Sequence, residues 1–244
     1  MTEIMSDKLA APKLVDRATF QAELDALRVS EKAHMKQSDA IAAARRRLPM
    51  VEVDATTRLI GEGGAVTLLD AFEGRRMLIA YYFMWHAGQP APEQCEGCTF
   101  YTSQVRELSF IHSRDVCQGP YEEGARYRDF MGWEMPWYSA PRESLETLLV
   151  GRRVGMMHIV CYLRRGSKVF ETYWTTRRGV EAMDNSYRLL DLTVYGRQER
   201  WEDSPPGWPR RPKGEHSYRI DGRPIPQWPR LGAGYSDDLG TGKR

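Results

Sequence analysis

The strongest strand signal in the chain is the apolar run Met77-Leu78-Ile79-Ala80-Tyr81-Tyr82-Phe83-Met84-Trp85. A run of this length and composition is typical of a central strand that helices cover on both faces. A loop containing glycine and prolines leads from it to Cys95-Glu96-Gly97-Cys98. Apolar positions then recur at helical spacing at Tyr101, Val105, Leu108 and His112, which predicts a helix beginning at the cysteine pair.

Shorter signals surround this strand. Alternating apolar residues and turn residues predict further strands at 51–53, 58–60, 65–69, 135–139, 158–163 and 169–174. Helical spacing predicts helices at 16–29, in a following stretch that Pro49 ends, at 121–130, and through Val180, Met183, Tyr187 and Leu190. Together they predict an α/β fold with a central mixed sheet flanked by helices.

The chain divides by composition into three parts. We expect a helical N-terminal arm at 1–48, the α/β domain at 49–200 and an irregular tail at 201–244. Seven of the 14 prolines lie between Pro205 and Pro229, and Trp208-Pro209-Arg210 returns as Trp228-Pro229-Arg230. Packing of the tail's tryptophans on the domain is the main interpretation, with partner binding through polyproline conformation as the alternative.

Composition excludes several classes of function. The 35 Lys and Arg residues nearly balance the 33 Asp and Glu residues, so neither nucleic acid nor an anionic membrane is an expected partner. No apolar run approaches the roughly 20 residues of a spanning helix, and residues 1–17 lack the apolar core of a secretion signal. Four cysteines in 244 residues are too few for a disulfide scaffold. We therefore expect a cytoplasmic location.

The cysteine pair indicates thiol–disulfide exchange. A sulfur at a helix N-terminus is stabilised as a thiolate, so Cys95 is the expected nucleophile and Cys98 the resolving thiol. The Glu96 carboxylate should raise the pKa of Cys95, and Gly97 should leave the turn flexible, which together predict a reducing rather than strongly oxidising couple. The expected partner is a disulfide in a small molecule or a protein, with no organic cofactor and the oligomeric state left open.

Two alternatives use the same pair differently. A metal-binding or metal-delivery protein, for copper or zinc, would combine Cys95 and Cys98 with His86 or His158. A non-catalytic interaction module would use the pair only to staple a turn. The other cysteines stand alone, and Cys161, within an apolar strand, is expected to be a small core residue.

The order of motifs resembles a family of thioredoxin-like bacterial proteins catalogued as domain of unknown function 899. The matching segments lie between about residues 35 and 205. They are Tyr82-Phe83-Met84-Trp85-His86, Glu93-Gln94-Cys95-Glu96-Gly97-Cys98-Thr99-Phe100, Cys117-Gln118-Gly119-Pro120-Tyr121, Phe130-Met131-Gly132-Trp133-Glu134-Met135-Pro136-Trp137 and Leu189-Leu190-Asp191-Leu192-Thr193-Val194-Tyr195-Gly196-Arg197. The resemblance implies a thioredoxin-like fold with the pair at its active site, and it implies no substrate.

The chain departs from the thioredoxin pattern at two places. Thioredoxins carry a cis-proline before an antiparallel strand, whereas Gly155-Met156-Met157-His158 has a methionine there, which predicts a more apolar pocket. A buried parallel strand should follow the active-site helix, but Arg114-Asp115-Val116-Cys117 offers only two apolar residues. We therefore expect a short, poorly formed strand at 115–118.

Candidate pocket residues come from the ends of these elements. Trp85, His86, Glu96, Met157 and His158 are the expected substrate-pocket side chains. An aromatic set that is mostly core, with Met84 and Trp85 nearest to a substrate, comprises Tyr81, Phe83, Trp85, Phe100 and Trp133.

Overall fold

The computed structural model describes residues 10–106, 108, 113–212 and 218–241. Two compact units are present, one formed by Met1–Pro49 with Tyr187–Lys213 and the other by Met50–Ser186 with Gly214–Arg244. The second unit contains the sheet and the cysteine pair. Within the described ranges, no helix is both long enough and apolar enough to cross a membrane.

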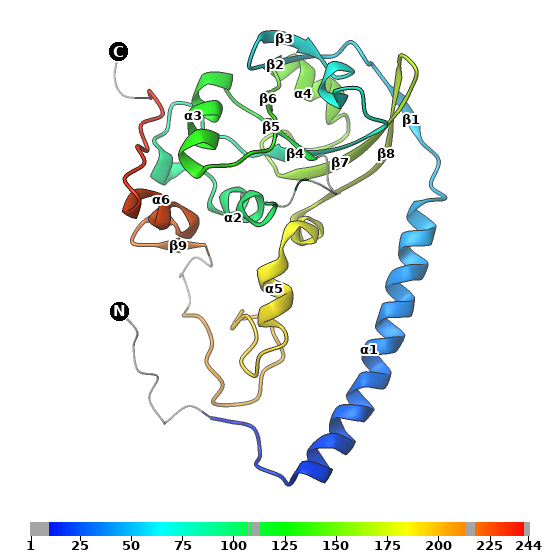
Figure 1. Ribbon diagram of the computed structural model, residues 1–244, viewed down its shortest axis with the longest axis vertical. Helices are drawn as coiled ribbons and strands as arrows, with labels where there is room; N and C mark the ends of the chain where they lie inside the picture. The colour runs from blue at the N-terminus through cyan, green and yellow to red at the C-terminus, as the bar shows by residue number, and fades with distance from the viewer. Residues whose placement is uncertain (1–9, 107, 109–112, 213–217, 242–244) are drawn as a thin grey trace. The chain divides into compact units, whose positions relative to one another are not determined.

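An eight-stranded sheet forms the centre of the second unit (Figure 1). Its strands are β1 (Val51–Val53), β2 (Arg58–Gly61), β3 (Gly64–Thr67), β4 (Met77–Phe83), β5 (Ser113–Cys117), β6 (Trp137–Ser139), β7 (His158–Arg165) and β8 (Lys168–Thr176). Their order across the sheet is β1-β8-β7-β4-β5-β6-β2-β3, which places β4 inside the sheet as the apolar run predicts.

The middle of the sheet is mixed. Strand β5 pairs parallel to both β4 and β6, while β7 pairs antiparallel to the other side of β4. Strands β7 and β8 form an antiparallel hairpin, and so do β2 and β3. A parallel crossover on one side of a central strand and an antiparallel hairpin on the other is the thioredoxin-like arrangement.

Helices cover both faces of the sheet in this unit. They are α2 (Glu96–Gln104), α3 (Tyr121–Met131) and α4 (Arg142–Leu148). The chain also contains α5 (Asn185–Leu190) and α6 (Trp228–Gly232). Successive side chains of a strand point to opposite faces, so β4 contributes to two cores. Tyr81 and Phe83 pack with residues of α2 and α3, whereas Tyr82 packs with Leu145 and Leu148 of α4.

The C-terminal part of this unit is more regular than expected. It contains a two-stranded hairpin of β9 (Arg219–Ile220) and β10 (Arg223–Pro224), then a 3₁₀ turn at Ile225–Gln227 and helix α6. Helix α2 contacts β10 and the 3₁₀ turn at Ile225–Gln227. Figure 1 shows β9 in orange and α6 in red.

The first unit contains one long helix, α1 (Arg17–Arg45). Asp16 caps its N-terminus by accepting a hydrogen bond from the Thr19 backbone N–H at 2.8 Å. The expected end near Val29 is wrong because no glycine or proline lies between residues 17 and 45 to break the helix. Within the second segment of this unit, Tyr187–Lys213, Arg197 donates two hydrogen bonds of 2.6 and 2.7 Å to the Asp191 carboxylate.

The expected short strand at 115–118 is also wrong. Strand β5 is five residues long and pairs with β4 along its whole length. Polar side chains occupy strand positions because Arg114 finds internal partners, the Ala71 carbonyl at 3.3 Å and the Glu73 carboxylate at 2.7 Å. A buried strand therefore formed without the apolar run that the sequence argument required.

Two helix predictions need correction, and one helix was not predicted. Helix α2 ends at Gln104, so Val105 caps it and Leu108 lies beyond it, while His112 lies outside the described residues. The predicted helix around 180–190 is split into a 3₁₀ segment, Arg177–Met183, and α5, because Asp184 between them has an extended backbone. Helix α4 had no counterpart in the prediction.

Candidate active site

The cysteine pair lies where the carboxyl end of β4 leads into α2. Cys95 is the N-cap residue of α2, and its sulfur accepts a hydrogen bond from the Cys98 backbone N–H at 3.4 Å. This sulfur occupies the position that a serine or aspartate oxygen takes at most helix starts. The helix N-terminus therefore directs its partial positive charge at Cys95.

The loop before Cys95 is fixed by a buried glutamine. Gln94 accepts a hydrogen bond from the His86 backbone N–H at 3.1 Å. It donates two others, to the carbonyls of His86 and Gln89, both at 2.9 Å. The sequence analysis missed Gln94, because nothing in its local sequence distinguishes it from a surface glutamine.

The two sulfurs have opposite electrostatic environments. A hydrogen bond from the Cys98 thiol lowers the pKa of Cys95, helped by the Cys98 backbone N–H and opposed by burial and by the Glu96 carboxylate. Burial raises the pKa of Cys98 well above its ordinary value, and the neighbouring Cys95 sulfur raises it further. The pair therefore ionises first at Cys95.

Access to the pair is narrow. Cys95 is 7% exposed and Cys98 is fully buried. Around the Gly97 turn between them lie Met157 and Tyr218: a Cβ on Gly97 would stand 4.0 Å from the Met157 methyl and 3.9 Å from the Tyr218 ring. Met157 and Tyr218 thus place apolar groups beside the turn that joins the two cysteines.

The predicted pocket residues separate into two groups. Glu96 and Met157 lie beside the pair, and Trp85 lies in the same core cluster as the cysteines, buried against Gly119. His86 is exposed, with Nδ1 2.7 Å from the Glu93 carbonyl oxygen. His158 is the register partner of Tyr82, so it belongs to the opposite face of the sheet, and burial lowers the pKa of its imidazole.

The alternative metal set is not assembled. Within the part of the chain that the structure describes, no three His, Cys, Asp or Glu side chains are grouped to hold a metal ion. His158 instead lies with its Nε2 3.0 Å from the Arg153 carbonyl oxygen. Cys161 is partly buried at the margin of the core cluster and Cys117 is fully buried within it.

Most of the predicted aromatic cleft is core. Tyr81, Phe83, Trp85 and Trp133 are buried, and the rings of Phe83 and Trp133 lie 5.9 Å apart. Phe100 is the partly buried member, and its ring lies 4.8 Å from that of Tyr218.

Two polar groups are buried beneath the pair. Tyr81 and Asp115 are register partners on β4 and β5. Among the described residues, neither the Tyr81 hydroxyl nor Asp115 Oδ2 has a partner at hydrogen-bonding geometry. Burial raises the pKa of both groups. The polar residues at 114–115, which led to the prediction of a poorly formed strand, were the signal in the sequence that a buried carboxyl group lies at Asp115.

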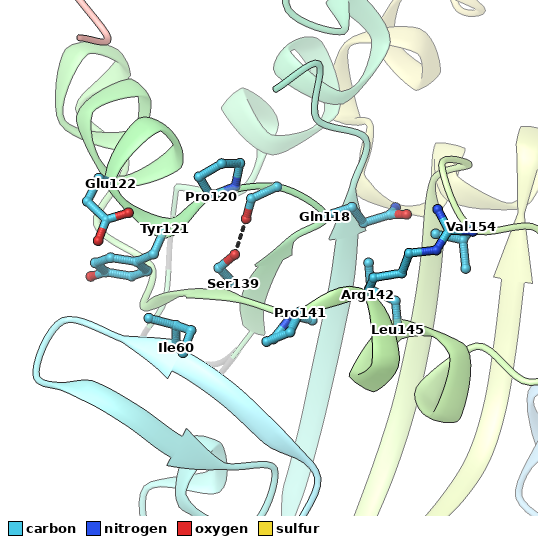
Figure 2. A pocket seen from close by; sticks show the side chains of 12 residues that line it. Ile60, Gln118, Pro120, Tyr121, Glu122, Ser139, Pro141, Arg142, Leu145 and Val154 are labelled. Atoms are coloured by element: carbon cyan, nitrogen blue, oxygen red, sulfur yellow. Dashed lines mark hydrogen bonds between the residues drawn. The ribbon is translucent and has the colours of Figure 1, made fainter. Parts of the chain in front are cut away.

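A cavity of about 560 Å³ opens at the carboxyl ends of β5 and β6, where α3 and α4 begin. Figure 2 shows Gln118, Ser139 and Arg142 around it, with the Ser139 hydroxyl bonded to the Gly119 carbonyl. Gln118 also donates to the Met156 carbonyl at 2.9 Å and accepts from the Gly155 N–H at 2.7 Å. It therefore ties this cavity to the loop that carries Met157.

The sheet topology and the Cys-x-x-Cys at the start of the helix that follows the central strand define a thioredoxin-like protein. The family described as "Bacterial protein of unknown function (DUF899)" matches residues 9–218, and the chain belongs to that family. Among solved structures, a thioredoxin from Wuchereria bancrofti is similar, with 15% identity and a TM-score of 0.35 over 55% of this chain and 90% of that one. No curated protein matches the chain.

Proposed function

We propose that this protein is a thiol–disulfide oxidoreductase that uses Cys95 and Cys98. The observation that carries the proposal is the asymmetry of the pair. Cys95 stands at the helix start with its pKa lowered, and Cys98 is fully buried with its pKa raised. Exchange requires one thiolate that attacks and a second thiol held in reserve.

The reaction follows from these roles. The Cys95 thiolate attacks one sulfur of the substrate disulfide, forming a Cys95–substrate disulfide while the other substrate sulfur leaves as a thiolate and takes up a proton. Cys98 then loses its proton and attacks the Cys95 sulfur, which releases the second substrate thiolate. Two electrons pass to the substrate, and a thiol reductant restores the Cys95–Cys98 dithiol.

The substrate is a disulfide in a small molecule or in an extended protein segment. The 7% exposure of Cys95 favours a slender group over a broad protein surface, and Met157 and Tyr218 beside Gly97 favour apolar atoms next to the disulfide.

Reduction of glutathione disulfide and of insulin, with dithiothreitol as the reductant, tests the proposal. We expect wild type to be active, Cys95→Ser to be inactive and Cys98→Ser to accumulate a mixed disulfide seen in the intact mass. Cys161→Ser, which alters a cysteine outside the pair, is the matched control and should retain wild-type activity. Equal activity of wild type and Cys95→Ser would refute the proposal.

A further inference from the structure

The family match ends at residue 218, and the segment 218–241 follows it. This segment packs on α2, the helix that carries the cysteine pair. The Tyr218 hydroxyl lies 3.0 Å from that of Tyr101 on α2. The fully buried Gln227 donates to the Ala91 carbonyl at 2.8 Å, in the loop that leads to Cys95. This segment is therefore a structural part of the dithiol site.

Arg219 of this segment contacts the residues on both sides of Cys95. Its guanidinium donates to the Pro92 carbonyl at 2.6 Å and to the Gln94 carbonyl at 3.0 Å. It also donates to the Glu96 carboxylate at 3.2 Å and to the Gly222 carbonyl at 2.9 Å. Its side chain is only 16% exposed. The planar fork of arginine is suited to binding several acceptors at once, as a lysine ammonium is not.

Two of the groups that accept from Arg219 belong to the residues on either side of Cys95. Gln94 precedes Cys95 and Glu96 follows it, so Arg219 brings a positive charge to the same loop in which Glu96 brings a negative one. We propose that Arg219 is a positioning residue that neutralises Glu96 and thereby keeps Cys95 available as the nucleophile. The inference rests on the proposed function of the pair and adds to it a residue from a distant part of the chain.

The other titratable groups facing Cys95 leave this charge pair dominant. Within the described residues they are Cys98 on α2, Tyr81 from β4 and Tyr127 from α3. Burial raises the pKa of both tyrosines, so they are neutral at physiological pH. Substitution of Glu96 and Arg219 therefore tests the charge pair directly.

The test is the pH dependence of Cys95 alkylation by iodoacetamide, followed by mass spectrometry of the Cys95 peptide. For Arg219→Gln we expect alkylation at pH 7 to slow roughly three- to tenfold and its midpoint to move to higher pH, because the Arg219 charge no longer offsets that of Glu96. Adding Glu96→Gln to Arg219→Gln should return the midpoint to near the wild-type value. Arg230→Gln, which removes the bond from α6 to the Phe130 carbonyl, controls for a loosened segment and should match wild type.

Glu96→Gln alone provides a second test in which every Arg219 contact to the backbone is kept, and it should move the midpoint to lower pH. The inference is overturned if Arg219→Gln has the wild-type profile, if the double variant stays as slow as Arg219→Gln, or if Glu96→Gln leaves the midpoint unchanged. Alkylation needs no disulfide substrate. A chain that reduces no disulfide but shows these shifts would refute the proposed function and leave the role of Arg219 intact.

Discussion

Trp85 lies directly against the backbone of Gly119, with no space for a side chain between them. A Cβ on Gly119 would stand 2.7 Å from Cγ of the Trp85 indole. The indole Nε1 donates to the Glu123 carboxylate at 2.9 Å, so Trp85 joins the residues after β4 to the first turn of α3. This contact fixes the chain where it turns toward the cysteine pair.

Gly119→Ala should therefore destabilise the protein. The added methyl collides with the indole, and overpacking of a well-filled core typically costs about 1–3 kcal/mol. Gly63→Ala is the matched control, because a Cβ there meets nothing within 4 Å. Urea denaturation of both variants measures the difference, and equal unfolding free energies would show that the Trp85 contact is not tight.

Asp115→Asn should change how stability depends on pH. Burial raises the pKa of Asp115, so the folded protein keeps this proton at pH values where the unfolded chain, with a pKa of about 3.9, has released it. Wild-type stability is therefore lost as pH rises above 4, and the variant removes that loss. We expect Asp115→Asn to gain stability relative to wild type between pH 4.5 and pH 8, measured by urea denaturation.

Asp70→Asn is a control of opposite sign. Hydrogen bonds from Thr67 lower the pKa of Asp70, so its contribution to stability is present above pH 4 and lost as pH falls. This variant should lose stability at pH 8. A gain for Asp115→Asn that does not grow with pH would contradict an ionisation effect.

Gln94→Ala should loosen the dithiol loop. It removes three hydrogen bonds between a buried side chain and backbone groups of the loop, and leaving such groups unsatisfied costs about 1–3 kcal/mol. Gln89→Ala removes an exposed glutamine of the same loop and should be neutral. Faster proteolysis within residues 86–95 in Gln94→Ala alone would report the loosening, whereas equal protease resistance would contradict it.

The redox couple should be reducing. Equilibration with glutathione buffers should leave wild type largely in the dithiol form only under strongly reducing conditions. Glu96→Gln should move the couple toward the oxidising side, because removing the carboxylate stabilises the Cys95 thiolate and with it the reduced form. A strongly oxidising wild type would contradict this prediction.

The sequence was sufficient to predict the parts of the fold that depend on local apolar patterns. The run ending at Phe83 predicted β4 at the centre of the sheet, and the strands predicted at 158–163 and 169–174 correspond to β7 and β8. Strand β5 was misjudged because burial of Arg114 depends on Glu73, which is 41 residues away in the sequence. Such a partnership leaves no periodic signal.

For the site, too, the sequence was sufficient only for features that depend on local order along the chain. The position of Cys95 at a helix start follows from the order of strand, loop and motif. The Arg219 contacts to the loop before Cys95 come from a segment more than 120 residues further along, with a separation of 123 residues to Glu96. Periodicity and motif spacing carry no information about a contact of that range.

Selective alkylation distinguishes the roles of Cys95 and Cys98. Treatment of the reduced protein with one equivalent of iodoacetamide at pH 6.5, followed by peptide mapping, should place the label on Cys95 and leave Cys98 and Cys117 unmodified. Labelling of Cys98 first, or equal labelling of both members of the pair, would contradict an account in which Cys95 ionises first and Cys98 is held in reserve.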